Sequence, residues 1–296
     1  MRVLVAGSSG LIGTAVVARL RSAGHEVLRL VRRAPVGPDE RRWDPPAGRI
    51  DADAFDGVDA VVSLGGAGIA DRPWSGARKQ LLRDSRIGPT EVLAAAVAEH
   101  GVASFVSAAA VGFYGDAGPA EIDENAPCGD GFLAGLVRDW EAATQAAVDG
   151  GARVVTLRTG LVLARRGGLL GPVRPLFKLA LGGRMGSGAQ YWPWISLDDE
   201  VGAICFLVEH SGVRGPVNVT GPAPVTNAEF TQELAAAVHR PAPLAVPAAV
   251  LRLLPGGMGE EMLLFGQRAV PAKLLAAGYD FQHRTLDDAL AVAVAR

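Results

Sequence analysis

Short apolar runs alternate with stretches of helical periodicity along most of this chain. The first run, Val3 to Ala6 behind Arg2, has the length and composition of a buried strand. Later runs predict strands at Glu26–Val31, Val58–Leu64, Ser104–Ala110, Arg153–Arg158 with a continuation through Thr159–Leu163, and Val217–Thr220. Other segments predict helices from near residue 10, at Pro89–His100, Val173–Ala180, Val201–Leu207 and Phe230–Val238, and from Leu286 onward. This alternation is typical of an α/β fold.

Three glycines follow the first strand at the point where it should turn into a helix. Gly7 allows a tight turn, Gly10 leaves no side chain between the main chain and a pyrophosphate, and Gly13 lets the helix approach the strand closely. The start of the helix would direct free N–H groups and the positive end of its dipole at phosphates. The stretch therefore predicts a dinucleotide site, with a glycine-rich turn that binds nothing as the alternative.

Arginines end the second predicted strand. Arg32 lies 19 residues after Gly13, close to the spacing of about 20 expected for the residue that recognises the adenosine ribose. An acidic side chain there favours a ribose 2′-hydroxyl, whereas an arginine accepts a 2′-phosphate. Arg32 thus favours NADP(H) over NAD(H), and a solvated pair with Arg33 is the alternative.

Two stretches between strands are rich in turn-forming residues. Residues 34–57 contain many Pro, Gly and Asp residues, and we expect only loops there. Gly65, Gly66 and Gly68 follow the strand at Val58–Leu64. A glycine-lined strand end beside the first turn suits the passage of a dinucleotide, because ligands bind outside the carboxyl ends of strands in open α/β sheets. An ordinary glycine turn is the alternative.

Composition is that of a globular protein with a large core. The 296 residues are 49% hydrophobic with a net charge of −2, so no face is marked for nucleic acid or an anionic membrane. The two cysteines, Cys128 and Cys205, form neither a disulfide framework nor a metal site. The first strand and its turn occupy the N-terminus, so we expect no signal peptide, and no apolar run reaches the length of a membrane span. We expect a cytoplasmic protein.

Longer segments make a family resemblance specific. They are Val5-Ala-Gly-Ser-Ser-Gly-Leu-Ile-Gly13, Leu30-Val-Arg-Arg33, Leu64-Gly-Gly-Ala-Gly-Ile-Ala-Asp-Arg72, Trp74, Arg83-Asp-Ser-Arg-Ile87, Ala110-Val-Gly-Phe-Tyr-Gly115, Phe132-Leu-Ala134, Trp140-Glu141, Leu157-Arg-Thr-Gly-Leu-Val-Leu163, Trp194-Ile195, Asp198-Asp199 and Gln267-Arg268. Together they cover almost the whole chain. The chain resembles an extended short-chain dehydrogenase/reductase, and within that superfamily it is similar to atypical epimerase-family proteins that carry a small extra C-terminal domain.

The resemblance implies a fold and a set of cofactor contacts. The fold is a Rossmann-like doubly wound parallel sheet with a smaller C-terminal substrate and lid region. Contacts to the pyrophosphate and adenosine side would come from Gly7, Ser9, Gly10, Leu11 and Ile12, and the contact to the 2′-phosphate from Arg32. Leu64 and Gly65 would line the ribose, Arg86 would reach a phosphate or ribose, and Val162 would lie near the nicotinamide. Without the resemblance, an arginine such as Arg86 is simply a solvated helix residue.

The residues for catalysis depart from the superfamily. Its active members use a Tyr-x-x-x-Lys helix, in which the lysine lowers the pKa of the tyrosine, with a nearby Ser or Thr. In the corresponding segment, neither the pair Phe132 and Leu136 nor the pair Leu133 and Val137 supplies a tyrosine or a lysine. Alanines occupy the expected hydroxyl position after Ser107. The standard proton relay is therefore absent.

Two weak catalytic candidates are left. They are Ser107 and Tyr114, and the tyrosine has a packing role as its alternative. The five histidines show no ligand spacing, so we expect no metal site and no Ser-His-Asp triad.

The C-terminal half changes in composition. Glycines divide residues 165–190, a segment that forms a lid in extended members of the superfamily. Gln190–Ile195 contains three aromatic residues, which either line an apolar pocket or pack the lid onto the sheet. Thr226 and Glu229 have capping-box spacing, and prolines at residues 240–248 mark a linker. We divide the chain into an NADP-binding domain at 1–165, to which later segments contribute, a lid and substrate region at 166–240, and a small domain at 241–296.

Two functions are compatible with this sequence. The first is an NADP(H)-dependent oxidoreductase or epimerase that acts on a small polar, sugar-like or carbonyl substrate with a non-standard acid/base group. The second is a catalytically inactive NADP(H) sensor or interaction module. The intact glycine turn fits both, and the lid favours the enzyme. A small-molecule substrate and a second copy in a homodimer are the expected partners, without nucleic acid or membrane.

Overall fold

One eight-stranded sheet forms the centre of the protein, in the order β13-β8-β6-β5-β1-β2-β3-β4. All of its pairings are parallel except the antiparallel pair of β3 and β4. The computed structural model describes residues 1–294. The strands of this sheet are β1 (Arg2–Ala6), β2 (Glu26–Val31), β3 (Glu40–Asp44), β4 (Arg49–Ile50), β5 (Ala60–Ser63), β6 (Ser104–Ala110), β8 (Arg153–Thr159) and β13 (Gly215–Val219). The predicted doubly wound α/β fold is confirmed.

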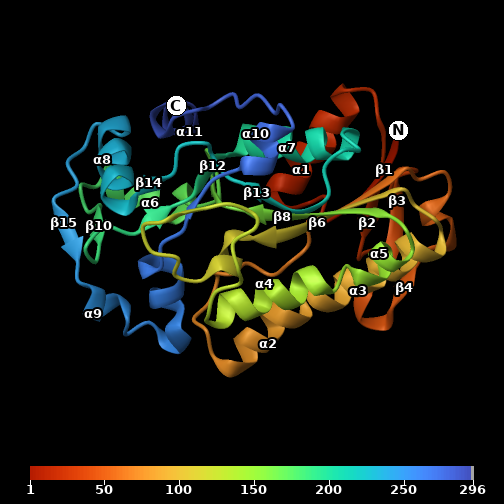
Figure 1. Cartoon of the computed structure of the whole chain (residues 1–296), viewed down its shortest axis with the longest axis horizontal. Helices are drawn as coiled ribbons and strands as arrows, with labels where there is room; N and C mark the ends of the chain where they lie inside the picture. The colour runs from red at the N-terminus through yellow and green to blue at the C-terminus, as the bar shows by residue number, and fades with distance from the viewer. Residues whose placement is uncertain (295–296) are drawn as a thin grey trace.

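Helices cover both faces of the sheet (Figure 1). The α-helices are α1 (Leu11–Ser22), α2 (Gly76–Asp84), α3 (Ile87–Glu99), α4 (Phe132–Ala142), α5 (Gln145–Asp149), α6 (Leu170–Lys178), α7 (Leu197–Glu209), α8 (Asn227–Ala237), α9 (Ala248–Leu251), α10 (Ala272–Ala276) and α11 (Leu286–Val294). Short 3₁₀ turns are η1 (Pro45–Ala47), η2 (Ala52–Phe55), η3 (Val111–Tyr114) and η4 (Pro255–Gly257), and η5 (Glu260–Leu264) is a π-helical turn.

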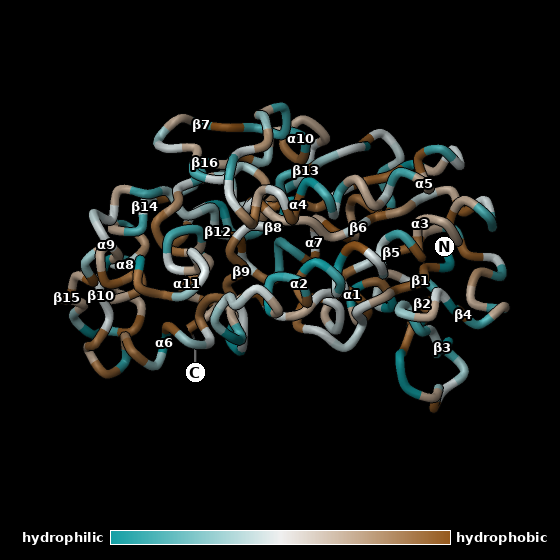
Figure 2. The backbone as a smooth tube through the Cα atoms, turned by 90° about the horizontal axis from the view of Figure 1, so that it is seen from below, coloured by the Kyte–Doolittle hydropathy of each residue, from teal (hydrophilic) through white to brown (hydrophobic). Residues whose placement is uncertain are grey.

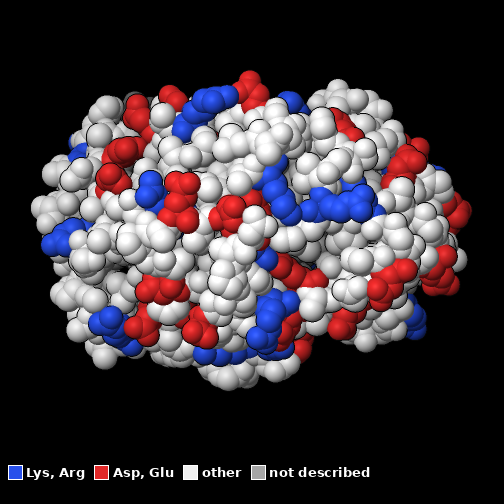
Figure 3. Space-filling model, viewed as in Figure 1, with Lys and Arg blue, Asp and Glu red and all other residues white. Residues whose placement is uncertain are grey.

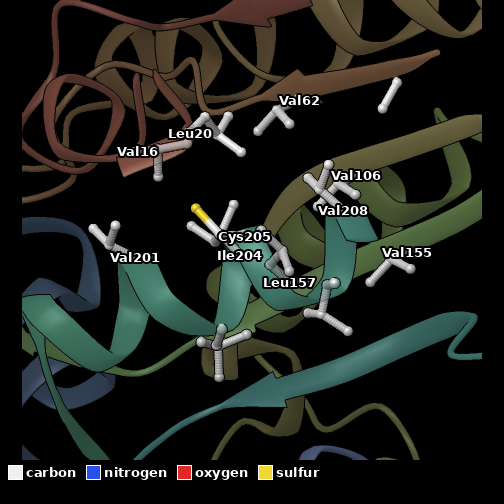
Figure 4. Packing of buried hydrophobic residues seen from close by; sticks show 14 of the residues in the cluster. Val16, Leu20, Val62, Val106, Val155, Leu157, Val201, Ile204, Cys205 and Val208 are labelled. Carbon is white, nitrogen blue, oxygen red and sulfur yellow. The ribbon is translucent and has the colours of Figure 1, made fainter. Parts of the chain in front are cut away.

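Alternation along β1 shows how the strands build two cores. Val3 and Val5 point to the face covered by α1 and α7, and Leu4 and Ala6 point to the face covered by α3 and α5. Because successive side chains of a strand point to opposite faces, a strand that is apolar throughout must be covered on both sides. Figure 4 shows the first core, where side chains of α1 and α7 meet those of β5, β6 and β8.

Smaller sheets lie beyond the carboxyl ends of the main strands. They pair β9 (Leu161–Leu163) with β12 (Trp194–Ser196), β10 (Gly183–Met185) with β15 (Leu244–Val246), β11 (Tyr191–Trp192) with β14 (Val225–Thr226), and β7 (Glu121–Ile122) with β16 (Arg268–Ala269). Figures 1 and 2 place α6, α8, β10 and β15 at one end of the long axis and β2 and β3 at the other. Trp192 and Trp194 are buried in a core with Phe230 of α8. Of the two roles predicted for this aromatic run, these two tryptophans therefore have the packing role.

The C-terminal segment, from β16 to α11, contacts several separate parts of the molecule. β16 pairs with β7, α10 contacts β13, and α11 lies in the core with Trp192 and Trp194. Asp199, in the first turn of α7, accepts hydrogen bonds from the main-chain N–H groups of Gln282 and His283 at 2.8 and 3.0 Å. The three-part domain division stays a prediction.

Two predictions about local structure are wrong. Residues 34–57 are not only loops, because Glu40–Asp44 is strand β3. Its sequence Glu-Arg-Arg-Trp-Asp carries no apolar run, and the strand is stabilised by ladder hydrogen bonds and by burial of Trp43 and Glu40. The second concerns the continuation through Thr159–Leu163. Strand β8 ends at Thr159, and Leu161–Leu163 is a separate strand, β9, which pairs with β12 outside the main sheet. The capping box at Thr226 and Glu229 is confirmed.

A buried carboxyl group lies at the carboxyl end of β8. Glu200 of α7 has no exposed surface, and its Oε1 accepts a hydrogen bond from Thr159 Oγ1 at 2.9 Å. Its Oε2 is buried and has no partner among residues 1–294. Burial raises the pKa of Glu200 to about 8, because desolvation disfavours the charged form.

We expect Glu200 to make stability depend on pH. A carboxyl whose pKa is raised by folding contributes fully below its ordinary pKa of 4.5, and this contribution is lost as the pH rises toward 8. Each pKa unit corresponds to about 1.4 kcal/mol. In denaturant titrations between pH 5 and 9, Glu200→Gln should flatten the decline of the free energy of unfolding. Parallel curves for the variant and the parent protein would contradict the assignment.

Candidate cofactor site

The turn after β1 places main-chain atoms of three segments in close contact. Gly7 has a φ of +79°, and a Cβ there would lie 2.7 Å from the carbonyl carbon of Leu64 at the end of β5. A Cβ on Gly13 would overlap the carbonyl group of Gly7, 2.9 Å from its carbon atom. Both glycines are therefore required by the fold itself, for backbone conformation and for close approach.

Gly10 differs from the other two glycines. A Cβ there would lie 3.4 Å from the Gly7 carbonyl oxygen, which is an ordinary contact, and Ser9, Gly10 and Leu11 are all exposed. Gly10 is the N-cap of α1 and no side chain caps this end of the helix. The exposed main chain at this point can therefore donate N–H groups to an anion, and only an external group would require glycine at position 10.

Apolar side chains border the same edge of the sheet. Ile12, Leu64 and Val162 come from α1, the end of β5 and β9, and all three are half-buried and pack on the core below α1 and α7. Gly65 follows Leu64, and a Cβ there would meet nothing within 4 Å. Leu64 and Val162, the predicted contacts to ribose and nicotinamide, therefore pack on the same core as Ile12 of the glycine turn.

The two arginines after β2 have different surroundings. Arg33 donates hydrogen bonds to both carboxylate oxygens of the buried Glu40, at 2.6 and 2.7 Å, and this pairing lowers the pKa of Glu40 to about 2. Arg29 reaches the same carboxylate at 3.0 Å. Arg32 is exposed and has no hydrogen-bond or ion-pair partner in residues 1–294. Of this pair, Arg32 is the one with a guanidinium available to a ligand.

Arg86 supports the loop after β5. Its guanidinium donates to the carbonyl oxygens of Ala67 at 2.9 Å and Leu82 at 3.1 Å, and lies against Gly66. Burial lowers its pKa to about 10. In this arrangement Arg86 shapes the glycine loop beside the cofactor edge, whereas the resemblance implied a direct contact with phosphate or ribose.

Apolar side chains occupy the positions where the superfamily has its tyrosine and lysine. Leu133, at the start of α4, packs on Gly112 just after β6, with its Cβ 3.2 Å from where a Gly112 Cβ would be. Phe132 packs beside it with Trp74 and Met262, and Val137 is buried. Ser107 has no exposed surface and lies within β6. No described side chain around Leu133 and Phe132 offers a hydroxyl group where a substrate could meet it.

Tyr114 belongs to a buried polar network. Its hydroxyl donates to Asn218 Oδ1 at 2.6 Å and accepts from Arg158 Nη1 at 3.0 Å. Arg158 also forms a two-pronged ion pair with Glu141 of α4, at 2.8 and 2.9 Å. Burial raises the pKa of Tyr114. This hydroxyl is fully engaged in linking η3, β8 and β13, so the packing role fits it better than proton transfer.

Glu261 is a site residue that the sequence did not indicate. It lies in η5, and its carboxylate oxygens accept hydrogen bonds from the main-chain N–H groups of Phe132 at 3.0 Å and Leu133 at 2.7 Å. α4 has no side-chain cap at its own N-cap residue, Gly131. The missing local cap was the one available signal, and it does not identify the partner.

The surface charge, the potential metal ligands and the apolar character of the helices were compared with what other kinds of binding site require. Figure 3 shows acidic and basic side chains interspersed on the viewed face, without a broad area of one sign. Residues 1–294 contain no group of three or more acidic, His or Cys side chains placed to hold a metal ion. None of the described helices combines the length and the apolar character needed to cross a bilayer.

Comparisons with known proteins cover nearly the whole chain. Residues 3–220 match the NAD dependent epimerase/dehydratase family, and residues 246–293 match a domain of unknown function, DUF1731. An epimerase family protein of Mycobacterium bovis is 55% identical over 294 residues, which cover 99% of this chain and 98% of the relative. The crystal structure of human epimerase family protein SDR39U1 (isoform 2) with NADPH is 37% identical, has a TM-score of 0.91 and is matched over 99% of both chains. Thermus thermophilus UDP-glucose 4-epimerase, at 20% identity and a TM-score of 0.76 over 99% of this chain and 98% of that chain, shares the fold.

Substitutions at two of the three glycines should separate cofactor binding from folding. Gly10→Val adds a side chain where only a ligand would meet it, so we expect at least a tenfold loss of NADPH affinity with the free energy of unfolding within about 1 kcal/mol of the parent. Gly13→Ala crowds the Gly7 carbonyl and should lower that free energy by about 1–3 kcal/mol. Cofactor titration and denaturant unfolding measure both. Unchanged NADPH affinity in Gly10→Val would place the cofactor elsewhere.

Proposed function

Because this chain belongs to the NAD dependent epimerase/dehydratase family, we propose that it is an NADP(H)-dependent oxidoreductase or epimerase acting on a small polar, sugar-like or carbonyl substrate with a non-standard acid/base group. The observation that carries the proposal is the glycine turn, in which the uncapped main-chain N–H groups of the first turn of α1, from Leu11 onward, lie beside a border of half-buried apolar residues. The human relative crystallised with NADPH supports the choice of cofactor. Homodimer formation stays a prediction.

Preference for the phosphorylated dinucleotide would come from one guanidinium. Glu40 engages Arg33 and Arg29, and also accepts the N–H of Val36 at 2.8 Å, so the loop after β2 is fixed from within. Arg32 then extends from a rigid base. A guanidinium suits a 2′-phosphate because it offers several N–H donors in one plane.

The chain's own residues set limits on the chemistry. When bound, NADPH supplies a hydride from its nicotinamide ring. Val162 would lie beside the ring and exclude water from it, and Leu133 and Phe132 would form an apolar wall where related enzymes have a tyrosine. The standard tyrosine and lysine are missing, so a proton would have to come from water, from the substrate or from a group such as Lys79, whose Nζ lies 4.7 Å from the centre of the Phe132 ring. The substrates that fit are those for which hydride transfer needs no strong acid beside the carbonyl oxygen.

A second function is favoured by the interior of the molecule. Tyr114 is held by Arg158 and Asn218, and Trp192 and Trp194 are buried instead of lining a pocket. A protein that binds NADPH without turnover, as a sensor or an interaction module, needs no free acid/base group. This alternative predicts binding that responds to the redox state of the cofactor.

Turnover can be tested on the protein saturated with NADPH for reduction and, in a second series, with NADP⁺ for epimerisation, because an epimerase first transfers a hydride from its substrate to the oxidised cofactor. Aldehydes, ketones and sugar nucleotides would be added in turn while the absorbance of the reduced nicotinamide is followed. Substrate-dependent loss of that absorbance, abolished in Gly10→Val, is the result expected for the oxidoreductase. Tight binding with no oxidation by any class of substrate, and no epimerised product, would favour the sensor.

Arg32→Ala tests the cofactor preference. Loss of a charged hydrogen bond to the 2′-phosphate corresponds to about 1.5–3 kcal/mol, or roughly a 10- to 100-fold weaker Kd for NADP⁺. The Kd for NAD⁺ should stay the same because NAD⁺ has no 2′-phosphate, so it provides the internal control. Equal weakening of both dinucleotides, or of neither, would show that Arg32 does not read the 2′-phosphate.

A further inference from the structure

A second concave surface lies away from the glycine turn. A pocket of about 690 Å³ opens between α6, the end of α8 and α11. It is lined by Arg174, Lys178, Ala237, Val238, His239, Arg240, Asp287, Ala291 and Val294. Its three helices lie together at the end of the long axis opposite β2 and β3 in both views (Figures 1 and 2). None of the residues predicted to contact the cofactor lines this pocket.

Cations dominate the lining. Arg174 and Lys178 are one helical turn apart on α6, and Arg240 follows α8, whereas Asp287 is the one acidic residue in the lining. Within residues 1–294 these three cations form no ion pair, although Arg33, Arg83 and Arg158 each pair with a carboxylate elsewhere. Like charges around a concave surface repel one another unless an anion binds among them.

Arg174 shows an unsatisfied donor at this place. Its terminal nitrogens donate only to main-chain carbonyl oxygens, those of Arg165 at 3.4 Å and Val294 at 2.8 Å. Its Nε is buried and has no partner among the described residues. The side chain as a whole is half-buried, so its terminal nitrogens stay accessible and can donate further hydrogen bonds to a ligand in the pocket.

The end of α8 fixes the other side of the pocket. His239 N donates to Ala236 O and Arg240 N to Ala235 O, both at 3.0 Å, which is the hydrogen-bond pattern of a Schellman motif. His239 has a φ of +54°, a conformation that usually requires glycine at this position. His239 adopts this left-handed conformation and therefore places its imidazole next to Arg240. The hydrogen bonds of the motif fix the backbone from which both side chains extend.

From these observations we propose that the pocket binds a small organic phosphate. Arg174 and Arg240 offer planar donor groups that match phosphate oxygens, and Lys178 adds a point charge. Ala237, Val238, Ala291 and Val294 give the apolar wall that the organic part of the ligand needs, and Asp287 can accept a hydrogen bond from a hydroxyl group. The volume lies in the range of small-molecule sites and is too large for a phosphate ion alone.

A ligand in this pocket would restrict the position of α6. Arg174 and Lys178 line the pocket, while Leu170 and Phe177 of the same helix are buried in the core that contains Trp192 and Trp194. A ligand that joins α6 to α8 and α11 would hold the predicted lid region in one place. The site would thus act on the molecule without touching the dinucleotide.

Calorimetric titration at constant ionic strength tests the proposal. Fructose 1,6-bisphosphate and inorganic pyrophosphate serve as probes, and the protein is saturated with NADP⁺ so that the dinucleotide site is filled. We expect one equivalent of the sugar bisphosphate to bind, more tightly than pyrophosphate. Lys178→Ala and Arg240→Ala should each weaken binding at least tenfold. Neither side chain has a contact whose loss would unfold the chain: Lys178 has no hydrogen bond among the described residues, and Arg240 donates only to His239 O.

Arg49→Ala is the matched control, because it removes an exposed arginine at β4 and leaves the pocket intact. Arg49→Ala should bind the sugar bisphosphate as the parent protein does. Arg32→Ala should also bind it normally in the absence of NADP⁺, so binding in this pocket can be judged separately from the cofactor proposal. Absence of binding at millimolar sugar bisphosphate would overturn the proposal. Equal weakening in Arg49→Ala and Lys178→Ala would do the same, because it would show attraction by net charge alone.

Discussion

Contact between main-chain atoms at Gly7 is the constraint on which the rest of the site depends. The turn after β1 touches the end of β5 on one side and the first turn of α1 on the other, and no Cβ fits at Gly7 or Gly13. Three segments are thus fixed without using a single side chain. Because the contacts are made by backbone, the N–H groups at the start of α1 stay exposed. Arg32, Leu64 and Val162 acquire their places relative to this turn from the strands that carry them.

Polar groups inside the molecule hold elements together instead of reaching the substrate side. Arg158 joins Glu141 of α4, Tyr114 of η3 and the main chain at Glu124, and Asn218 continues the network into β13. Removing one member would leave charged or polar groups buried without partners, which is strongly destabilising. This explains why a tyrosine so close to the carboxyl end of β6 is kept in a protein that lacks the proton relay.

Much of the fold could be predicted from local patterns in the sequence. The features that were missed depend on contacts between residues that are distant in the chain. The glycine turn, the strand Glu26–Val31 and the capping box at Thr226 depend on neighbours in the chain, and the match of residues 3–220 confirms the family resemblance. Strand β3 was missed because its buried Glu40 is stabilised by Arg29 and Arg33, which no hydrophobic pattern records. The sequence likewise could not separate Arg32 from Arg33. Which of the two pairs with a carboxylate depends on the position of Glu40, seven residues after Arg33 at the start of β3.

The cap on α4 has a consequence for how the protein is made. Phe132 and Leu133 donate to Glu261, which lies 129 and 128 residues later in the chain. A ribosome releases the residues of α4 long before it adds Glu261, so the first turn of this helix must wait with its N–H groups on water. The apolar wall around Leu133 therefore takes its final form only near the end of synthesis. Until then the nascent protein has a complete glycine turn beside an unfinished substrate side.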